Sequence, residues 1–217
     1  MKRVSIRAVS EEMEARSKRI VETAVELAEQ GGFEAVRLRD VASHAGVALG
    51  TLYRRFRSKE DLLVAALELE TSDLERRITH RPPRGGSALE RVTGFFTMAT
   101  RGLCRRPNLA RAMVKAMASG DPELATKVAN FHDRMGRLIL AALRGQGVAE
   151  SEAGAPILPG GEGERGGEVE QQLCYALNLV WFGLLVGWSS GLHSQAAMMD
   201  HMSHSAELLL LGAEAKG

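Results

Sequence analysis

The sequence is poor in the residues that mark secreted and disulfide-rich proteins. It has 2 cysteines and 6 prolines among 217 residues, and 5% of its residues are aromatic. Cys104 and Cys174 form neither a disulfide framework nor a zinc pattern, which is typical of a protein in a reducing compartment. The opening residues also lack the apolar segment of a secretory signal. We therefore expect a cytoplasmic protein.

The sequence also has no large excess of positive or negative charge. Lys+Arg 28 against Asp+Glu 27 gives a formal net charge of +1, so bulk charge neither favours nor excludes a nucleic-acid partner. With 45% hydrophobic and 25% charged residues, the composition is that of an ordinary globular protein. The length suits one large domain or two small ones.

One stretch contains no charged residue. No Asp, Glu, Lys or Arg occurs between Gln171 and Met199, and a membrane span needs about 20 predominantly apolar residues. Against a span stand Asn178, a break at Ser189–Gly191, and the absence of basic flanks that would set an orientation. We expect instead the centre of a helical domain or a subunit interface, and no membrane contact.

Helical periodicity dominates the chain and strand signals are nearly absent, so the predicted fold class is all-α. Prolines and glycines mark a boundary at 80–86, and 145–167 is predicted to be an exposed loop. Ser58 and Asp61 form a capping signature at the start of a long helix. Nine helices are expected in two parts, at about 20–28, 38–45, 49–56, 58–77, 89–103, 107–117, 122–142, 168–190 and 195–211.

The most informative region runs from Leu38 to Leu63. Two short helices joined by a tight turn at 45–47 form the unit that places a second helix in the major groove of DNA. Gly46 suits this turn because it adopts a positive φ without a Cβ clash. Ala42 is small where the helices must approach, and Val41, Val47 and Leu52 supply the small core between them.

A basic segment follows the second short helix. Arg54, Arg55, Arg57 and Lys59 place four cations within six residues, interleaved with Tyr53 and Phe56. Lysines and arginines supply most of the non-specific affinity for DNA through its phosphates. A solvated basic face is the alternative explanation, but the helix-turn-helix pattern beside it favours DNA binding.

These motifs together resemble the TetR family of bacterial transcriptional regulators. The resemblance runs without a gap from Arg16 to Leu67 and includes the Gly-Phe pair, Arg-Asp-Val-Ala, Ala-Gly-Val, Gly-Thr-Leu-Tyr and Ser-Lys-Glu. It implies a dimer that binds a palindromic operator in double-stranded DNA. It also implies an N-terminal arm at 1–15, a three-helix DNA-binding domain at 16–62, and a domain for ligand binding and dimerisation at 63–217.

The resemblance also assigns nine positions to DNA contact. It implies that the groove is faced by Leu49, Gly50, Thr51 and Arg54. Tyr53 and Lys59 are expected to hold phosphates, and Arg37, Arg39 and Ser43 to add base or backbone contacts. The chain departs from the family at Ala48 and Arg37, where relatives often carry Ser or Thr, so the recognition helix lacks a side-chain N-cap.

The C-terminal half suggests a hydrophobic effector. Bulky apolar residues with few polar groups suit such a ligand, although each of them is also an ordinary core residue. The candidate ligand-binding residues are Phe95, Phe96, Met98, Leu103, Met113, Met117, Phe131, Met135, Leu138, Trp181, Leu184 and Trp188. Segments 105–135 and 178–191 are similar to actinobacterial repressors of cholesterol catabolism, which implies a steroid or an acyl-coenzyme A thioester. The last two helices are expected to form the homodimer interface.

No pattern points to catalysis. Gly161, Gly163 and Gly166 match a dinucleotide-binding spacing, but a proline-containing loop precedes them where a strand is needed. The histidines at 193, 201 and 204 lack the spacing of a metal site. No enzyme activity, cofactor or metal is therefore predicted. The sequence predicts a ligand-responsive dimeric repressor; the alternative is a small-molecule-binding helical protein with a vestigial DNA domain.

Overall fold

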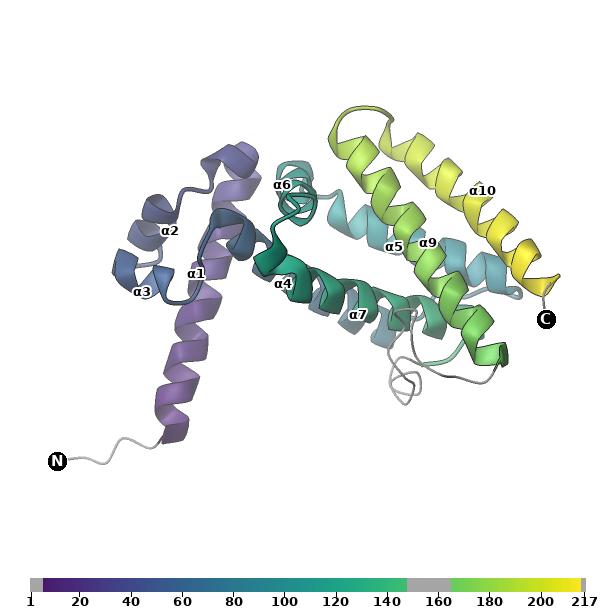
Figure 1. Ribbon diagram of the computed structural model, residues 1–217, viewed down its shortest axis with the longest axis horizontal. Helices are drawn as coiled ribbons and strands as arrows, with labels where there is room; N and C mark the ends of the chain where they lie inside the picture. Colours follow the sequence, from purple (N-terminus) through teal and green to yellow (C-terminus); the bar gives the residue numbers. More distant parts are fainter. Residues whose placement is uncertain (1–5, 148–164, 216–217) are drawn as a thin grey trace. The chain divides into compact units, whose positions relative to one another are not determined.

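The computed structural model describes residues 6–147 and 165–215, and in this part of the chain the regular secondary structure is entirely helical. It contains nine α-helices and one short 3-10 helix, which confirms the all-α prediction (Figure 1). The helices are α1 (Ile6–Ala35), α2 (Leu38–His44), α3 (Leu49–Tyr53), α4 (Lys59–His80), α5 (Ala88–Leu103), α6 (Pro107–Met117), η1 (Pro122–Leu124), α7 (Ala125–Arg144), α9 (Arg165–Ser189) and α10 (Gln195–Glu214).

Several helix ends differ from the prediction. α1 begins at Ile6, so most of the expected arm is helical. The helical path is interrupted at Gly31 and Gly32, where the backbone leaves helical dihedral angles, and a short helical turn follows to Ala35. α3 ends at Tyr53 rather than at residue 56, and the N–H groups of Arg55 and Phe56 that follow both bond to the carbonyl of Leu52. α9 begins at Arg165, inside the predicted loop, whereas residues 148–164 of that loop lie outside the described part.

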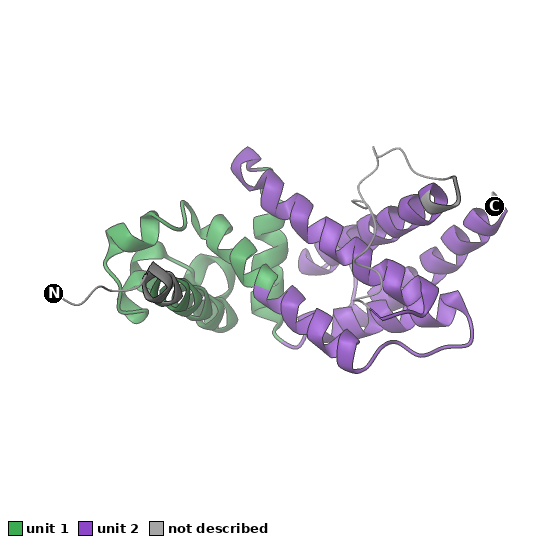
Figure 2. Ribbon diagram, turned by 90° about the horizontal axis from the view of Figure 1, so that it is seen from below, with its two compact units in different colours: residues 1–68, 106–120 green, residues 69–105, 121–217 purple. Residues whose placement is uncertain are grey.

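The chain divides into two compact units, coloured separately in Figure 2. The first contains residues 1–68 and 106–120, and the second contains 69–105 and 121–217. This division differs from the expected boundary at residue 62, because it falls inside the continuous helix α4 and assigns α6 to the N-terminal unit. α6 joins that unit by packing along α1.

In the N-terminal unit, α1 packs against both α2 and α6. Ala24 and Ala28 are fully buried on α1, and Ile20 retains 1% of its exposure. The two alanine side chains are small, which allows neighbouring helices to approach α1 closely. α2 packs against α3 and holds it on the unit. The buried apolar face of α1 therefore supports α2 directly, and α2 in turn supports α3.

In the C-terminal unit, four helices form a closed ring of contacts. α5 packs against α7, α7 against α9, α9 against α10, and α10 against α5. Phe95, Ile139, Leu177 and Met198 are buried in its core. Arg91 closes one end by donating from Nε to the Ala142 carbonyl at 3.0 Å and from Nη2 to the Leu143 carbonyl at 2.7 Å. These are carbonyls of the last turn of α7, which lack partners within the helix.

The uncharged stretch forms α9 and the start of α10. The segment Glu168–Ser189 is long and apolar enough to cross a membrane by length and composition, yet 39% of its most apolar window is buried in the structure. One side of α9 supplies buried residues to the four-helix ring, including Leu177 and Trp181. The helix ends at Ser189, as the Ser-Ser-Gly break predicts, and Gly191 follows with a φ of 79°.

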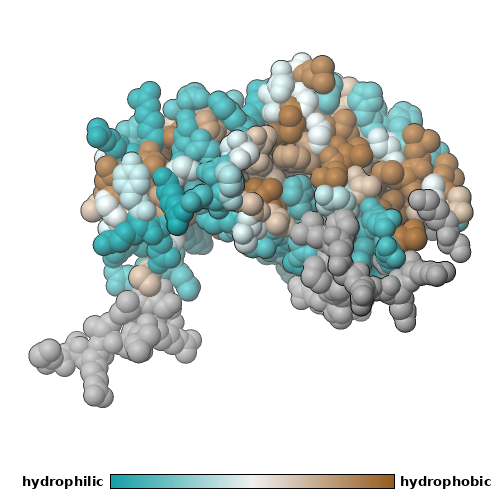
Figure 3. All heavy atoms as spheres, in the orientation of Figure 1, coloured by the Kyte–Doolittle hydropathy of each residue, from teal (hydrophilic) through white to brown (hydrophobic). Residues whose placement is uncertain are grey.

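Large apolar side chains remain exposed on the C-terminal unit. Leu179 of α9 is 42% exposed, and Leu208 and Leu211 of α10 are 71% and 57% exposed. In Figure 3 hydrophobic residues gather over the region of α9 and α10. Contiguous exposed apolar surface of this kind commonly marks a protein interface.

Candidate nucleic-acid interface and effector core

The turn between α2 and α3 has the geometry that the sequence predicts. Gly46 adopts a φ of 66°, a conformation that costs glycine little because it has no Cβ. The next residue, Val47, donates its N–H to the Ala42 carbonyl at 3.0 Å, which folds the chain back on α2. Val41, Ala42 and Leu52 are buried between the elements. The two short helices are therefore a packed unit and not a flexible loop.

The residues expected to contact DNA lie at the surface. Arg37, Arg39, Ser43, Gly50, Tyr53 and Arg54 are exposed, and Leu49, Thr51 and Lys59 are half-buried. Tyr53 keeps 51% of its exposure, which is unusual for a large aromatic side chain. Arg54 donates to the hydroxyl of Thr51 at 3.0 Å. All nine residues lie on or beside α2, α3 and the start of α4 in the N-terminal unit, and none of them is buried.

The two departures from the family are visible as missing caps. Ala48 precedes α3 and Arg37 precedes α2, and neither side chain accepts a hydrogen bond from its helix. α4 has a side-chain cap: the Ser58 hydroxyl accepts from the Asp61 N–H at 3.1 Å, and the Asp61 carboxylate accepts from the Arg57 N–H at 3.0 Å. The Ser58 cap, with Asp61 reaching back to the residue before it, confirms the predicted start of the long helix.

Lys59 is already engaged by side chains of the same unit. Its ammonium lies 3.1 Å from the Glu34 carboxylate and 3.9 Å from the centroid of the Phe33 ring. The sequence gives no signal for this contact, because Glu34 and Lys59 are 25 residues apart. A phosphate at this position would therefore meet a lysine that already has an anionic partner.

The twelve candidate ligand-binding residues divide between the two units. Ten lie on α5, α7 and α9 of the C-terminal unit: Phe95, Phe96, Met98, Leu103, Phe131, Met135, Leu138, Trp181, Leu184 and Trp188. Met113 and Met117 lie on α6 in the N-terminal unit. The structure therefore does not bring those two methionines into the same packed unit as the other ten.

Aromatic rings form the centre of the ten-residue group. The ring centroids of Phe95 and Phe96 are 5.0 Å apart, and those of Phe96 and Trp181 are 5.9 Å apart. The indole N–H of Trp181 donates to the buried Thr100 hydroxyl at 2.9 Å. A buried indole needs such a partner, so Thr100 belongs to this core although the sequence pattern did not single it out.

A second polar pair lies in the same unit and was not predicted. Asn178 of α9 donates from its amide nitrogen to Nδ1 and to the backbone carbonyl of His132 on α7, both at 3.1 Å. Its amide oxygen is buried without a hydrogen-bond partner. Leaving a buried acceptor unsatisfied costs about 1–3 kcal/mol. The lone Asn178 within an apolar run is the only sequence signal that could have found this position, and from the sequence alone it served only as an argument against a membrane span.

Burial also affects the titratable groups of this unit. The pKa of His132 is lowered, chiefly because burial penalises the imidazolium, while the Asn178 hydrogen bond acts in the opposite direction. Burial raises the pKa of Cys174 to about 12, so this thiol is a poor nucleophile at neutral pH. Within 6–147 and 165–215, no group of three or more His, Cys, Asp or Glu side chains is arranged to hold a metal.

Comparison with known proteins gives consistent relatives for both parts of the chain. Residues 20–66 match the bacterial regulatory proteins of the tetR family, and residues 85–158 match the tetracyclin repressor-like C-terminal domain. The chain is 34% identical over 197 residues to the HTH-type transcriptional repressor KstR of Rhodococcus jostii, which covers 90% of this chain and 82% of that repressor.

Solved structures share the fold. A TetR transcriptional regulator from Rhodococcus sp. RHA1 matches with a TM-score of 0.72 and 27% identity, covering 91% of this chain and 96% of that one. Thermus thermophilus FadR, a transcriptional repressor solved in complex with lauroyl-CoA, matches with a TM-score of 0.62 and 19% identity, covering 89% of this chain and 93% of that one.

We predict that His132 makes the stability of the protein depend on pH. Its folded-state pKa lies below the unfolded value, so the unfolded chain binds more protons as the pH falls below about 6.5. Stability is therefore complete above that pH and declines below it, by at most about 1.4 kcal/mol per pH unit from this one group. Urea unfolding between pH 5 and 8 measures the slope.

The His132→Gln variant should have a flatter profile than the wild type. His80→Gln removes an exposed histidine and serves as the matched control, which should retain the wild-type slope. Identical slopes for the wild type and His132→Gln would contradict the prediction.

Proposed function

Because the chain belongs to the TetR family of bacterial regulatory proteins, which are helix-turn-helix transcriptional regulators and not enzymes, we propose that it is a ligand-responsive dimeric repressor in the cytoplasm. It binds a palindromic operator and is released from it by a hydrophobic effector. The observation that carries this proposal is the packed helix-turn-helix with nine exposed or half-buried candidate DNA contacts.

The chemistry of these side chains supports DNA binding. Arg54 and Thr51 offer donors to base edges in the major groove. Arg37, Arg39 and Lys59 carry positive charge for the phosphates, and Tyr53 projects a phenolic hydroxyl from an exposed ring. Phosphate contacts position a protein on the duplex and base contacts specify the sequence. Both kinds of donor are therefore present on one small unit.

The exposed leucines support dimerisation through α9 and α10. A palindrome requires two recognition helices about 34–36 Å apart, one from each subunit. An interface of two helices from each copy would cover Leu179, Leu208 and Leu211, whose exposure has no explanation within one chain. The interface would be a four-helix arrangement of α9 and α10 with their copies.

The C-terminal core supports an apolar effector with a polar group. Phe96, Phe131 and Trp181 provide aromatic surface, and the Asn178 amide oxygen is a buried acceptor that lacks a donor. A hydroxyl of a steroid or an amide N–H of an acyl-coenzyme A thioester would supply that donor. Lauroyl-CoA is held by a repressor that shares this fold, which supports the choice of acyl-coenzyme A thioesters as first probes.

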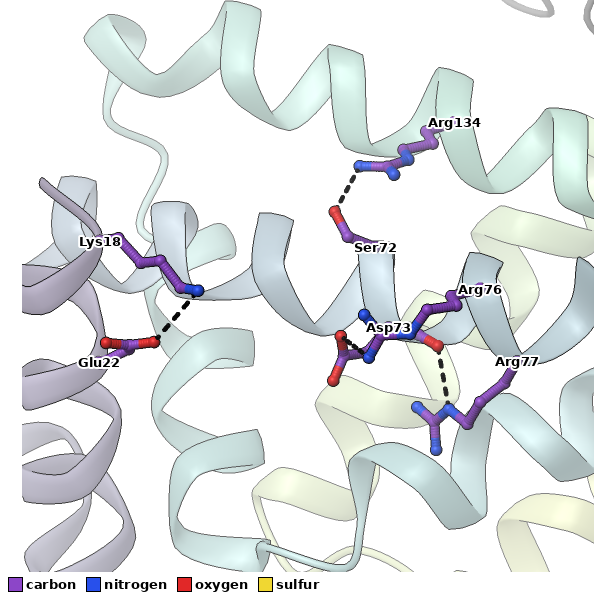
Figure 4. A network of polar contacts seen from close by, with 7 residues as sticks. All are labelled: Lys18, Glu22, Ser72, Asp73, Arg76, Arg77 and Arg134. Carbon is purple, nitrogen blue, oxygen red and sulfur yellow. Dashed lines mark hydrogen bonds and ion pairs between the residues drawn. The ribbon is translucent and has the colours of Figure 1, made fainter. Parts of the chain in front are cut away.

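The continuous helix α4 links the effector-binding unit to the DNA-binding unit, so its movement can release the protein from the operator. Its N-terminal turns belong to the DNA-binding unit, and its last turns belong to the C-terminal unit. There Arg134 of α7 donates to the Ser72 hydroxyl at 3.2 Å and to the Glu75 carboxylate, and the Ser72 bond appears in Figure 4. An effector shifts the equilibrium only to the extent that it binds the released state more tightly.

Selection of bound duplexes from a random DNA library tests the proposal directly. We expect a palindrome to be enriched reproducibly, because two copies of the same reading surface are related by a two-fold axis. Tyr53→Ala should weaken binding to the selected site by about tenfold, the loss expected for a hydrogen bond to a charged group. Tyr53→Phe separates the hydroxyl from the ring. A folded dimer that enriches no sequence would favour the vestigial alternative.

Charge placed on the leucine surface should separate the subunits. We expect Leu208→Glu combined with Leu211→Glu to yield a folded monomer, because a dimer would bury two carboxylates per subunit without partners. Light scattering coupled to size exclusion measures the mass. Met13→Glu alters an exposed apolar residue of the other unit and should remain dimeric. A dimer that survives both leucine changes would place the interface elsewhere.

Effector candidates should displace the operator. We expect lauroyl-CoA or a coenzyme A thioester of a steroid acid to raise the dissociation constant for the selected DNA, whereas coenzyme A alone should not. Fluorescence anisotropy of a labelled operator measures the release. If neither thioester acts although the wild-type protein binds the operator, the proposed effector class is wrong and the proposed DNA binding stands.

A further inference from the structure

One carboxylate in the DNA-binding unit is shared by two lysines from different helices. Glu34, near the end of α1, lies 3.1 Å from the ammonium of Lys59 at the start of α4 and 3.0 Å from that of Lys115 near the end of α6. Lys115 is 81 residues from Glu34 in the sequence. The folded unit therefore gathers two cations and one anion that the sequence keeps far apart.

The same two ammonium groups lie over one aromatic ring. Lys59 is 3.9 Å and Lys115 is 4.2 Å from the centroid of Phe33, within the range of cation–π attraction. The pKa of Glu34 is lowered by its hydrogen bonds to Lys115 and Lys59, so the carboxylate is ionised at neutral pH. We call Phe33, Glu34, Lys59 and Lys115 the lysine cluster.

Further polar contacts anchor α6 beside the cluster. The Asn108 side-chain amide donates to the Glu29 carbonyl at 3.1 Å, and Arg106 lies 3.5 Å from the Glu29 carboxylate. α6 is continuous at both ends with the C-terminal unit, at 105–106 and 120–121. It is therefore a segment of the DNA-binding unit that the chain joins directly to the other unit at both ends.

The cluster has a direct consequence for a phosphate contact by Lys59. A carboxylate 3.1 Å away competes with DNA phosphate for the same ammonium. With Lys115 in place the carboxylate is shared and the cluster carries a net charge of +1. Without Lys115 the cluster is neutral and Glu34 has only Lys59 as its partner. Lys115 therefore raises the fraction of Lys59 that is available to DNA.

We propose that Lys115 and Glu34 are positioning residues that control how available Lys59 is to a DNA phosphate. Lys115 shares the Glu34 carboxylate, so Glu34 binds Lys59 less strongly than it would alone. When α6 is displaced, Lys115 leaves Glu34, the Glu34–Lys59 ion pair strengthens, and operator binding weakens. This inference rests on the proposed function, in which Lys59 contacts a phosphate. It assigns to α6, in addition to α4, a part in controlling operator binding.

Operator affinity in a set of charge variants tests the inference. We expect Lys115→Gln to raise the dissociation constant for the selected operator by about fivefold, the upper range for an exposed ion pair. The slope of log affinity against log salt should also decrease in magnitude by up to about 1, because one phosphate contact is weakened. Thermal unfolding should remain as in the wild type, since Lys115 is exposed.

Two double variants show whether Lys115 acts through its partners. In the Glu34→Gln background, adding Lys115→Gln should change the dissociation constant by less than twofold, because the competing carboxylate is gone. In the Lys59→Gln background the same addition should also have less than a twofold effect. The matched control is Lys18→Gln, which removes a lysine from α1 whose partner Glu22 is 3.8 Å away (Figure 4); its effect should be the same with and without Glu34.

The outcomes separate this inference from the proposed function. An undiminished effect of Lys115→Gln in the Glu34→Gln background would mean that Lys115 acts on DNA by itself, and would overturn the inference alone. A Lys115→Gln variant that binds like the wild type would do the same. Absence of sequence-specific duplex binding by the wild-type protein would overturn the proposed function together with the inference.

Discussion

The pair of hydrogen bonds between Asp61 and residues 57 and 58 is the interaction on which the start of the long helix α4 depends. Asp61 is 6% exposed, and its carboxylate accepts from the Arg57 N–H while its own N–H donates to Ser58. Loss of such a cap costs about 1 kcal/mol or more, and here it also fixes where the basic segment ends and α4 begins. The same helix continues into the C-terminal unit, so this cap marks the start of the one helix that the two units share.

Local patterns predicted most of the fold, since turns and caps are decided by neighbouring residues. Gly46, the Ser58–Asp61 signature and the Ser189–Gly191 break all occur where the sequence indicates. The failures are non-local. α6 joins the N-terminal unit through Asn108 and Lys115, whose partners lie 79 and 81 residues away. No periodicity within α6 distinguishes packing against α1 from packing against a helix of the other unit.

The candidate site shows the same contrast between what local patterns predict and what they do not. The DNA-contact positions were assigned from a contiguous motif, and the structure displays all of them at the surface, although their contacts with DNA stay a prediction. The effector residues were assigned from hydrophobicity alone, which does not distinguish a core from a ligand site. Polar residues in that core are more informative: Thr100 is satisfied by Trp181, whereas the Asn178 oxygen is not satisfied by anything within the described chain.

α9 carries residues of both the proposed effector core and the proposed dimer interface. Asn178 and Trp181 are buried on its inner face, while Leu179 between them is exposed. In a tightly packed ring of four helices, a molecule that inserts beside Asn178 displaces α9 or α7, because interiors at crystal-like density do not absorb added volume. A displacement of α9 changes the leucine surface as well. Under the proposed function, effector binding and subunit spacing would be coupled through this single helix. Such coupling is reciprocal, so a change that separates the subunits would also alter the affinity for the effector.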